Sequence, residues 1–216
     1  MENLIGKKKF SLGQNASTIL FLLLFIALFG AILSFATPNF LTAYNVGVIF
    51  KQMSFFGVAA LGQTLVLIIG GIDLSIGSTA CLSGILFALC MTKTGMHPLL
   101  AVVICVIAGA LMGYINGLFI TKLKLHPFIV TLAASNIGYG FVLVISEGYT
   151  ISGITGKVLT IGQGMLGPIP VPTVIFIVFV AILTYILKCT PFGRELFAIG
   201  GNAAASRLVG INVESR

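Results

Sequence analysis

The sequence has 216 residues, of which 58% are hydrophobic and 8% are charged. Soluble domains carry roughly 25% charged residues, so this composition excludes an ordinary soluble protein and indicates an all-α polytopic membrane helix bundle. The formal net charge is +7. Because the basic residues lie between apolar runs, they predict membrane topology and not binding to nucleic acid.

The first apolar run covers residues 19–36 and follows the three lysines Lys7 to Lys9. Its length corresponds to about 27 Å of helix at about 1.5 Å per residue, enough to cross a bilayer. A signal peptide is the competing interpretation, since Ser34 to Ala36 resembles a cleavage site. The run is longer than the usual apolar region of a signal peptide, and more runs follow. We therefore predict a retained first helix, with residues 1–18 as a cytoplasmic N-terminus.

Further apolar runs predict a bundle of about six spanning segments in a single transmembrane domain over residues 1–216. They cover residues 53–69, 76–91, 99–120, 128–145 and 171–187. A loop rich in Gly and Pro, residues 147–170, separates the last two runs. A loop of this length is either functional or merely solvated, and docking of a partner is the functional hypothesis.

The stretch Gly70-Gly71-Ile72-Asp73-Leu74-Ser75 lies between the second and third runs. An acid at the bilayer centre costs about 2.5–3.5 kcal/mol on insertion scales. The paired glycines let the backbone leave a helix, and Asp73 or Ser75 can accept N–H groups of a helix that restarts near Ile76. The pattern predicts a broken or re-entrant helix with a polar joint. A cytoplasmic turn with an ordinary N-cap is the alternative.

In the fourth run, Ala101, Cys105, Gly109, Gly113 and Gly117 recur every four residues. One face of that helix is therefore almost without side chains, which predicts close packing against another helix.

Two asparagines lie within apolar runs, Asn116 in the fourth and Asn136 in the fifth. For each, an interhelical hydrogen bond is the more common role. A position on a solute path is the functional alternative, so both are candidates for the joint and the translocation path.

The basic residues favour one orientation, with the N-terminus inside. Six crossings then place residues 147–170 outside and the basic tail 188–216 inside, together with Lys122 and Lys124. Lys51 and Lys93 are the exceptions.

The tail contains a second informative pattern. Asn202 can cap a short helix that runs through Ala205 to Leu208, and Gly210 can end it. A helix on the inner face that carries Arg207 beside Leu208 suits docking into a groove of another protein. A helix lying on anionic lipid is the alternative.

Enzymatic motifs are absent from the sequence. Asp73 has no second membrane-embedded acid, as an aspartyl protease would need, and neither GxSxG nor HExxH occurs. The cysteines have no metal-ligand spacing, and no cofactor is expected. There is also no GxxxxGK[ST], so work driven by ATP must come from another subunit.

Four segments together resemble the carbohydrate permease family of ATP-binding cassette importers, the ribose, xylose, arabinose and galactoside type. They are GGIDLSIG at 70–77, NG at 116–117, PFIVTLA at 127–133, and the tail FGRELFAIGGN and AASRLVGINV. The resemblance implies a bacterial inner-membrane permease that imports a monosaccharide. It also implies three protein partners: a cytoplasmic ATPase, an extracytoplasmic sugar-binding protein and a second permease copy.

The resemblance makes 188–216 a cytoplasmic coupling segment that docks on the ATPase. The docking candidates are Gly193, Arg194, Gly200, Gly201, Asn202, Ala205, Arg207, Leu208 and Gly210. Ser206 and Val209 depart from the family's usual GN..AARLSGI. Family members also continue beyond Arg216, so the chain resembles the N-terminal two-thirds of a permease. A branched-chain amino-acid permease and a secondary transporter are the alternatives.

Overall fold

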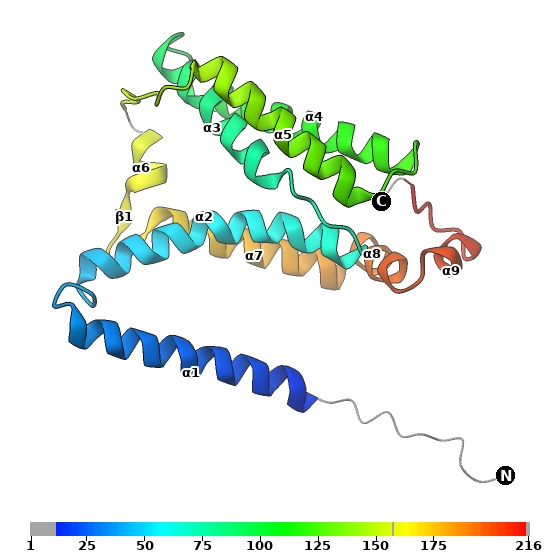
Figure 1. The fold of residues 1–216 in the computed structure, drawn as a ribbon, viewed down its shortest axis with the longest axis horizontal. Coiled ribbons are helices and arrows are strands. Elements are labelled where there is room, and N and C mark those ends of the chain that lie inside the picture. Colours follow the sequence, from blue (N-terminus) through cyan, green and yellow to red (C-terminus); the bar gives the residue numbers. More distant parts are fainter. Residues whose placement is uncertain (1–11, 157, 215–216) are drawn as a thin grey trace. The chain divides into compact units, whose positions relative to one another are not determined.

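The computed structural model describes residues 12–156 and 158–214, with side chains from Ala16 onward. The predicted cytoplasmic N-terminus therefore falls mostly outside the described residues. The helices are α1 (Leu12–Ala36), α2 (Ala43–Ile68), α3 (Ile76–Thr92), α4 (Pro98–Thr121), α5 (Pro127–Ser146), α6 (Val158–Gln163), α7 (Val171–Cys189), α8 (Pro191–Gly201) and α9 (Ala203–Leu208). Two short strands, β1 (Met165–Leu166) and β2 (Ile169–Pro170), pair antiparallel (Figure 1).

The all-α membrane class is confirmed. Within the described residues, α1, α2, α4, α5 and α7 are long and apolar enough to cross a membrane. The predicted third crossing, α3, has 17 residues, or about 26 Å of helix. The helix begins only at Ile76, because the chain between Ile68 and Ile76 is not helical, and this late start makes it short.

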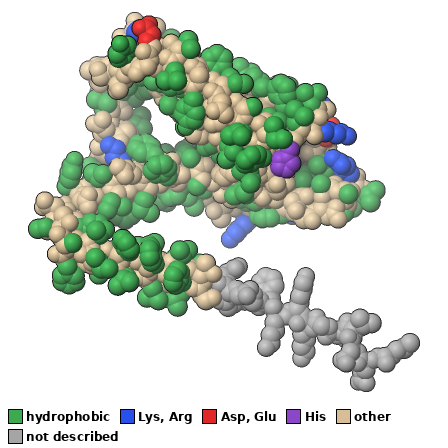
Figure 2. Space-filling view, viewed as in Figure 1, with side chains coloured by type: hydrophobic (Ala, Val, Ile, Leu, Met, Phe, Trp, Pro, Cys, Tyr) green, Lys and Arg blue, Asp and Glu red, His purple; other side chains and the backbone are tan. Residues whose placement is uncertain are grey.

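Most large apolar side chains on these helices are exposed, as lipid-facing or subunit-facing surfaces are. The face shown in Figure 2 is covered mainly by hydrophobic side chains, while Lys, Arg, Asp and Glu are few. This distribution agrees with a bundle that has lipid around it.

The chain divides into two compact units after Ile49. The first holds α1 and the beginning of α2. Helix α1 ends at Ala36, two residues before Pro38, since a residue that precedes proline is disfavoured in helical geometry. Asn45 Nδ2 donates to the Phe40 carbonyl at 2.8 Å and fixes the connecting turn.

Helix boundaries differ from the apolar runs at two places. Helix α1 begins seven residues before Ile19, and α2 begins at Ala43, ten residues before Met53. The added first turns of α2 include Asn45 and Lys51. Polar residues near a helix end remain in contact with water or headgroups, so the helix extends beyond its apolar core.

In the second unit, α3, α4 and α5 pack together as one three-helix group. Helix α7 contacts α2, and their interface includes a polar pair: Ser54 Oγ donates to Thr173 Oγ1 at 2.9 Å. Three residues later, Gly57 lies against the ring of Phe176, where a Cβ would overlap it. At both contacts a small residue of α2, Ser54 or Gly57, faces a side chain of α7.

The predicted outer loop is not irregular throughout. It contains α6 and the β1–β2 hairpin, whose register pairs Met165 with Pro170. Gly167 occupies the hairpin turn with φ +60°, a conformation that glycine adopts without steric cost. The hairpin leads directly into α7 at Val171.

The tail contains two helices where the sequence predicted one. Helix α8 begins at Pro191, and the Thr190 side chain accepts from the Gly193 N–H. Its buried side includes Leu196 and Ile199, which are 2% and 7% exposed. The predicted second helix, α9, follows Asn202 at once.

Candidate functional site

The predicted break in the helix is present. Helix α2 ends in a Schellman arrangement: the Gly70 N–H donates to Leu67 O at 3.0 Å, and the Gly71 N–H donates to Val66 O at 2.9 Å. Gly70 has φ +84°, the left-handed conformation that this cap requires. The chain then stays non-helical until Ile76. The segment 69–75 is called the joint from here on.

The backbone of the joint is held by a side chain of α2. In the amide orientation that satisfies both groups, Gln63 Nε2 donates to Asp73 O at 3.0 Å and Gln63 Oε1 accepts from Asp73 N at 3.3 Å. One side chain thus pairs with both polar groups of a non-helical residue. Such pairing is what backbone outside helices and strands needs when it lies away from water.

The Asp73 carboxylate stabilises the turn before α3. Its Oδ1 accepts from the Ser75 N–H at 2.7 Å and from the Ser75 hydroxyl at 2.6 Å. Ser75 does not cap α3 through its side chain, contrary to one of the two predicted arrangements. Its carbonyl accepts the Thr79 N–H at 2.8 Å, and its hydroxyl is taken up by the interaction with Asp73.

Two neighbouring helices clamp the same turn. Asn116 Nδ2 of α4 donates to Ser75 Oγ at 2.9 Å. Thr131 Oγ1 of α5 shares its proton between Pro127 O of its own helix at 2.9 Å and Ile72 O of the joint at 3.2 Å. Ser75, Asn116 and Thr131 are 2%, 5% and 2% exposed. The predicted interhelical role of Asn116 is therefore confirmed, and α2, α4 and α5 all contribute a polar side chain to the joint.

The first turn of α3 packs very close to α5. An added Cβ at Gly138 would lie 2.7 Å from Ser78 Oγ. Only glycine therefore leaves room for the Ser78 side chain at this position. Ser78 is fully buried and its hydroxyl donates to Ser75 O at 2.9 Å. The start of α3 is thereby fixed on the side that faces α5.

Asp73 lines two cavities. One, of about 310 Å³, lies beside the Phe55-to-Ala59 part of α2 and the Gly109-to-Gly113 part of α4. The other, of about 610 Å³, follows further along both helices and reaches Val66 and Lys122. Asp73 and Gly113 line both cavities. We call them the central cavity and the Lys122 cavity.

The glycine face of α4 has two environments. Near Gly109 it packs on α3, since an added Cβ would lie 3.5 Å from Thr79 Cγ2. Cys105 Sγ donates to Ser83 O at 3.1 Å in the same interface, one turn earlier. At Gly113 and Gly117, an added Cβ would meet no atom of the described residues within 4 Å, and both glycines line cavities. The predicted close packing therefore holds at Gly109 and gives way to open space beyond it.

Helix α8 reaches the end of α2. A Cβ on Gly200 would overlap the carbonyl oxygen of Ile68, and Gly193 approaches the backbone of Leu187 in the same way. These two docking candidates therefore pack against backbone of this chain and position α8. The Ile68 contact lies two residues before Gly70, where the joint bends.

Helix α9 has the predicted caps. Asn202 Oδ1 accepts from the Ala205 N–H at 3.0 Å, and Gly210, with φ +87°, follows the last turn. Leu208 and Val209 are 89% and 77% exposed, and Arg207 is exposed beside them. These three residues form a small outward surface, called the α9 tip below. Arg194, Gly201, Asn202 and Ala205 are also exposed.

Asn136 does not belong to the joint. Its Nδ2 donates to Leu132 O of its own helix at 2.9 Å, and its side chain is exposed. Thr131, five residues earlier, takes the position on α5 that contacts the joint. The sequence pattern did not predict this role of Thr131.

The sequence pattern also did not predict the role of Gln63. Its signal was a lone amide within the second apolar run, at a depth where such a group needs a partner.

No group of three or more metal-ligating side chains occurs in the part of the chain that the structure describes.

Residues 45–215 match the family of permease components of branched-chain amino acid transport systems. The chain is 41% identical over 184 residues to the ribose import permease of Bacillus subtilis (strain 168), covering 84% of this chain and 57% of that protein. It is 33% identical over 198 residues to the D-allose transport system permease of Escherichia coli (strain K12), covering 91% and 60%.

A fructose import permease of Rhizobium meliloti is 33% identical over 209 residues, which are 92% of this chain and 56% of that protein. The chain thus spans less than two thirds of each of these curated relatives. No solved structure matches it.

Proposed function

The chain belongs to the family of transport-system permease components that matches residues 45–215, and on this premise we propose that it forms part of the membrane subunit of an ATP-binding cassette importer for a monosaccharide. The sugar class is supported by the names of its relatives, which import ribose, allose and fructose. The subunit lies in a bacterial inner membrane with its N-terminus inside.

One observation carries the transport part of this proposal: Asp73 lines two cavities that follow each other along α2 and α4. Side chains of three helices hold the non-helical backbone between them. Non-helical backbone between two apolar helices, held by protein side chains and bordered by cavities, is typical of a solute path. A helix that only spans lipid needs no such joint.

The energy source is an ATPase on the inner side. The α9 tip offers exposed leucine and valine side chains next to an arginine. An apolar anchor with a basic neighbour, on a helix with both ends capped, suits insertion into a groove of another protein. Among the alternatives, lipid binding would favour apolar residues along a whole helix face, and α9 has only six residues.

The path from this surface to the joint is short. Helix α9 adjoins α8, and Gly200 of α8 touches Ile68 at the end of α2. Closure of the ATPases would displace α9 and α8, shift the end of α2, and change which cavity is open at Asp73. This chain would carry out no covalent chemistry.

On the outer side, the segment 147–170 with α6 and the hairpin would contact a sugar-binding protein. A second permease copy or relative would complete the transporter. Both partners are part of the proposal, which the relatives' names as import or transport-system permeases support.

The test is uptake by the full-length permease, reconstituted in liposomes with its ATPase and its sugar-binding protein. We expect ATP-dependent uptake of at least one of D-ribose, D-allose and D-fructose, and none of L-leucine. Uptake of L-leucine alone would favour the branched-chain amino-acid alternative. Uptake of any of these solutes without the ATPase would favour a secondary transporter.

A further inference from the structure

A row of hydroxyl groups lines the central cavity. Thr79 and Ser83 lie four residues apart on one face of α3, and Ser75, the residue just before the helix, lies four residues before Thr79. Thr79 Oγ1 has no hydrogen-bond partner among the described residues, and Ser83 Oγ has only a long one, to Cys105 O at 3.5 Å. Two hydroxyl groups in an apolar helix are therefore available toward the cavity.

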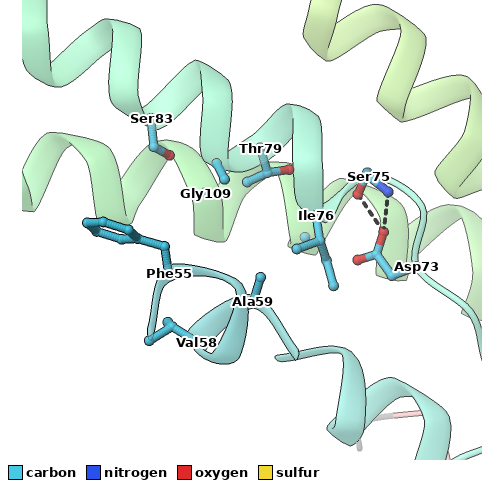
Figure 3. Close-up of a pocket in the computed structure, with 11 residues that line it drawn as sticks. Phe55, Val58, Ala59, Asp73, Ser75, Ile76, Thr79, Ser83 and Gly109 are labelled. Carbon is cyan, nitrogen blue, oxygen red and sulfur yellow. Dashed lines mark hydrogen bonds between the residues drawn. The ribbon is translucent and has the colours of Figure 1, made fainter. Parts of the chain in front are cut away.

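The opposite wall is apolar. Phe55, Val58 and Ala59 of α2 face the cavity, and Figure 3 shows them across from Thr79 and Ser83. Helix α4 adds Gly109 and Gly113 to the wall, so it contributes backbone and almost no side-chain volume. The cavity is thus mostly apolar, and its hydroxyl groups lie on the α3 side, where Ile76 and Ala80 also line it.

A carboxylate stands at one end of this hydroxyl row. Asp73 Oδ1 is engaged by Ser75, whereas Oδ2 has no hydrogen-bond partner within the described residues. Figure 3 shows that second oxygen turned away from Ser75, on the side where Ile76 and the α2 wall lie. An ionised carboxylate oxygen is a strong acceptor for a hydroxyl donor.

We propose that the central cavity is a transit site for one monosaccharide, in which Asp73 Oδ2 and the Thr79 and Ser83 hydroxyls bind sugar hydroxyls while Phe55 covers an apolar C–H face. This inference rests on the proposed function. A sugar that leaves water loses hydrogen bonds from every hydroxyl, and only polar groups along its path can replace them. The volume, about 310 Å³, lies at the small end of ligand sites, about 300–1,000 Å³.

The main test replaces Thr79 by Val in the full-length transporter, which exchanges a hydroxyl for a methyl group of similar size. Thr92→Val is the matched control, because Thr92 lies on the same helix and its hydroxyl bonds to Ala88 O. We expect Thr79→Val to lower the uptake rate of D-ribose, D-allose or D-fructose about tenfold, while the control transports normally. The ATPase rate stimulated by the binding protein should stay within about twofold of wild type for both.

A second variant fills the cavity. Gly113→Leu puts a side chain into open space, so we expect a folded protein that hydrolyses ATP and does not take up sugar. Gly140→Leu is its control, since Gly140 also has open space around it, on α5 and outside the cavity. Equal elution profiles in detergent verify that all four variants fold.

Uptake by Thr79→Val and Gly113→Leu that equals their controls would overturn the transit site and leave the importer function standing. A wild-type assembly that takes up none of the three sugars would overturn the proposed function, and the transit site with it.

Discussion

Gly200 of α8 touches the carbonyl oxygen of Ile68, the last residue of α2, with no room for a Cβ between them. Two residues further on, the chain leaves the helix at Gly70 and enters the segment that holds Asp73. This contact connects the helices of the proposed coupling segment to the joint. The first prediction follows from it.

Gly200→Ala forces α8 away from the backbone of Ile68, because backbone atoms cannot yield as a flexible side chain does. We expect the ATPase subunit to remain bound. The ratio of sugar transported to ATP hydrolysed should fall at least about fivefold. Gly201→Ala is the control, since a Cβ there meets no atom of the described residues within 4 Å. The measurement is the ratio of sugar transported to ATP hydrolysed in liposomes. Equal ratios for the two variants would contradict a coupling role of this contact.

Asp73→Asn separates the charge of the joint from its geometry. An amide Oδ1 can accept the same two hydrogen bonds from Ser75, so the turn should persist and the protein should fold. We expect uptake to fall about tenfold, because the negative charge beside both cavities is lost. Uptake at the wild-type rate would show that Asp73 serves the turn alone.

Asn116→Ala removes the hydrogen bond from α4 to the joint. Ser75 is 2% exposed, and its Oγ would keep only the hydrogen bond to Asp73. We expect the free energy of unfolding in detergent to fall by about 1–2 kcal/mol. Asn136→Ala is the control, since that side chain is exposed and bonds only within its own helix. A similar loss in both variants would contradict a stabilising role of the hydrogen bond between Asn116 and Ser75.

Replacing Arg207 and Leu208 by Asp places two negative charges on the α9 tip. Both residues are exposed, so the fold of the permease should be unaffected. We expect the ATPase subunit to be lost from the purified complex. Lys93→Asp, on the loop predicted to lie outside, should leave the complex intact. Unchanged co-purification of the ATPase with the double variant would count against docking at this tip.

The sequence pattern predicted the features that depend on local chemistry. Apolar runs predicted the spanning helices, since a bilayer requires long apolar stretches in helical form. The paired glycines predicted the end of α2 at the joint. Asn202 predicted the cap of α9 because an N-cap acts only three residues along the chain.

Features that depend on distant contacts were not predictable in this way. Gln63 and Thr131 bind the joint from other helices, and the choice of Thr131 over Asn136 depends on how α5 is rotated toward α3. The glycine periodicity of α4 is uniform, yet only Gly109 packs on α3. Whether a small residue meets a helix or a cavity is decided by the packing of the neighbours, and the periodicity contains no information on it.

The most direct test concerns the side of the membrane on which the α9 tip lies. Leu208→Cys, in the full-length protein with Cys81, Cys90, Cys105 and Cys189 replaced by Ser, is treated with a membrane-impermeant thiol reagent. Tyr149→Cys, on the segment predicted to lie outside, is the positive control. We predict that intact cells label position 149 and not 208, and that opening the inner face labels 208 unless the ATPase is bound. Labelling of position 208 in intact cells would contradict the account, because no cytoplasmic ATPase could then dock there.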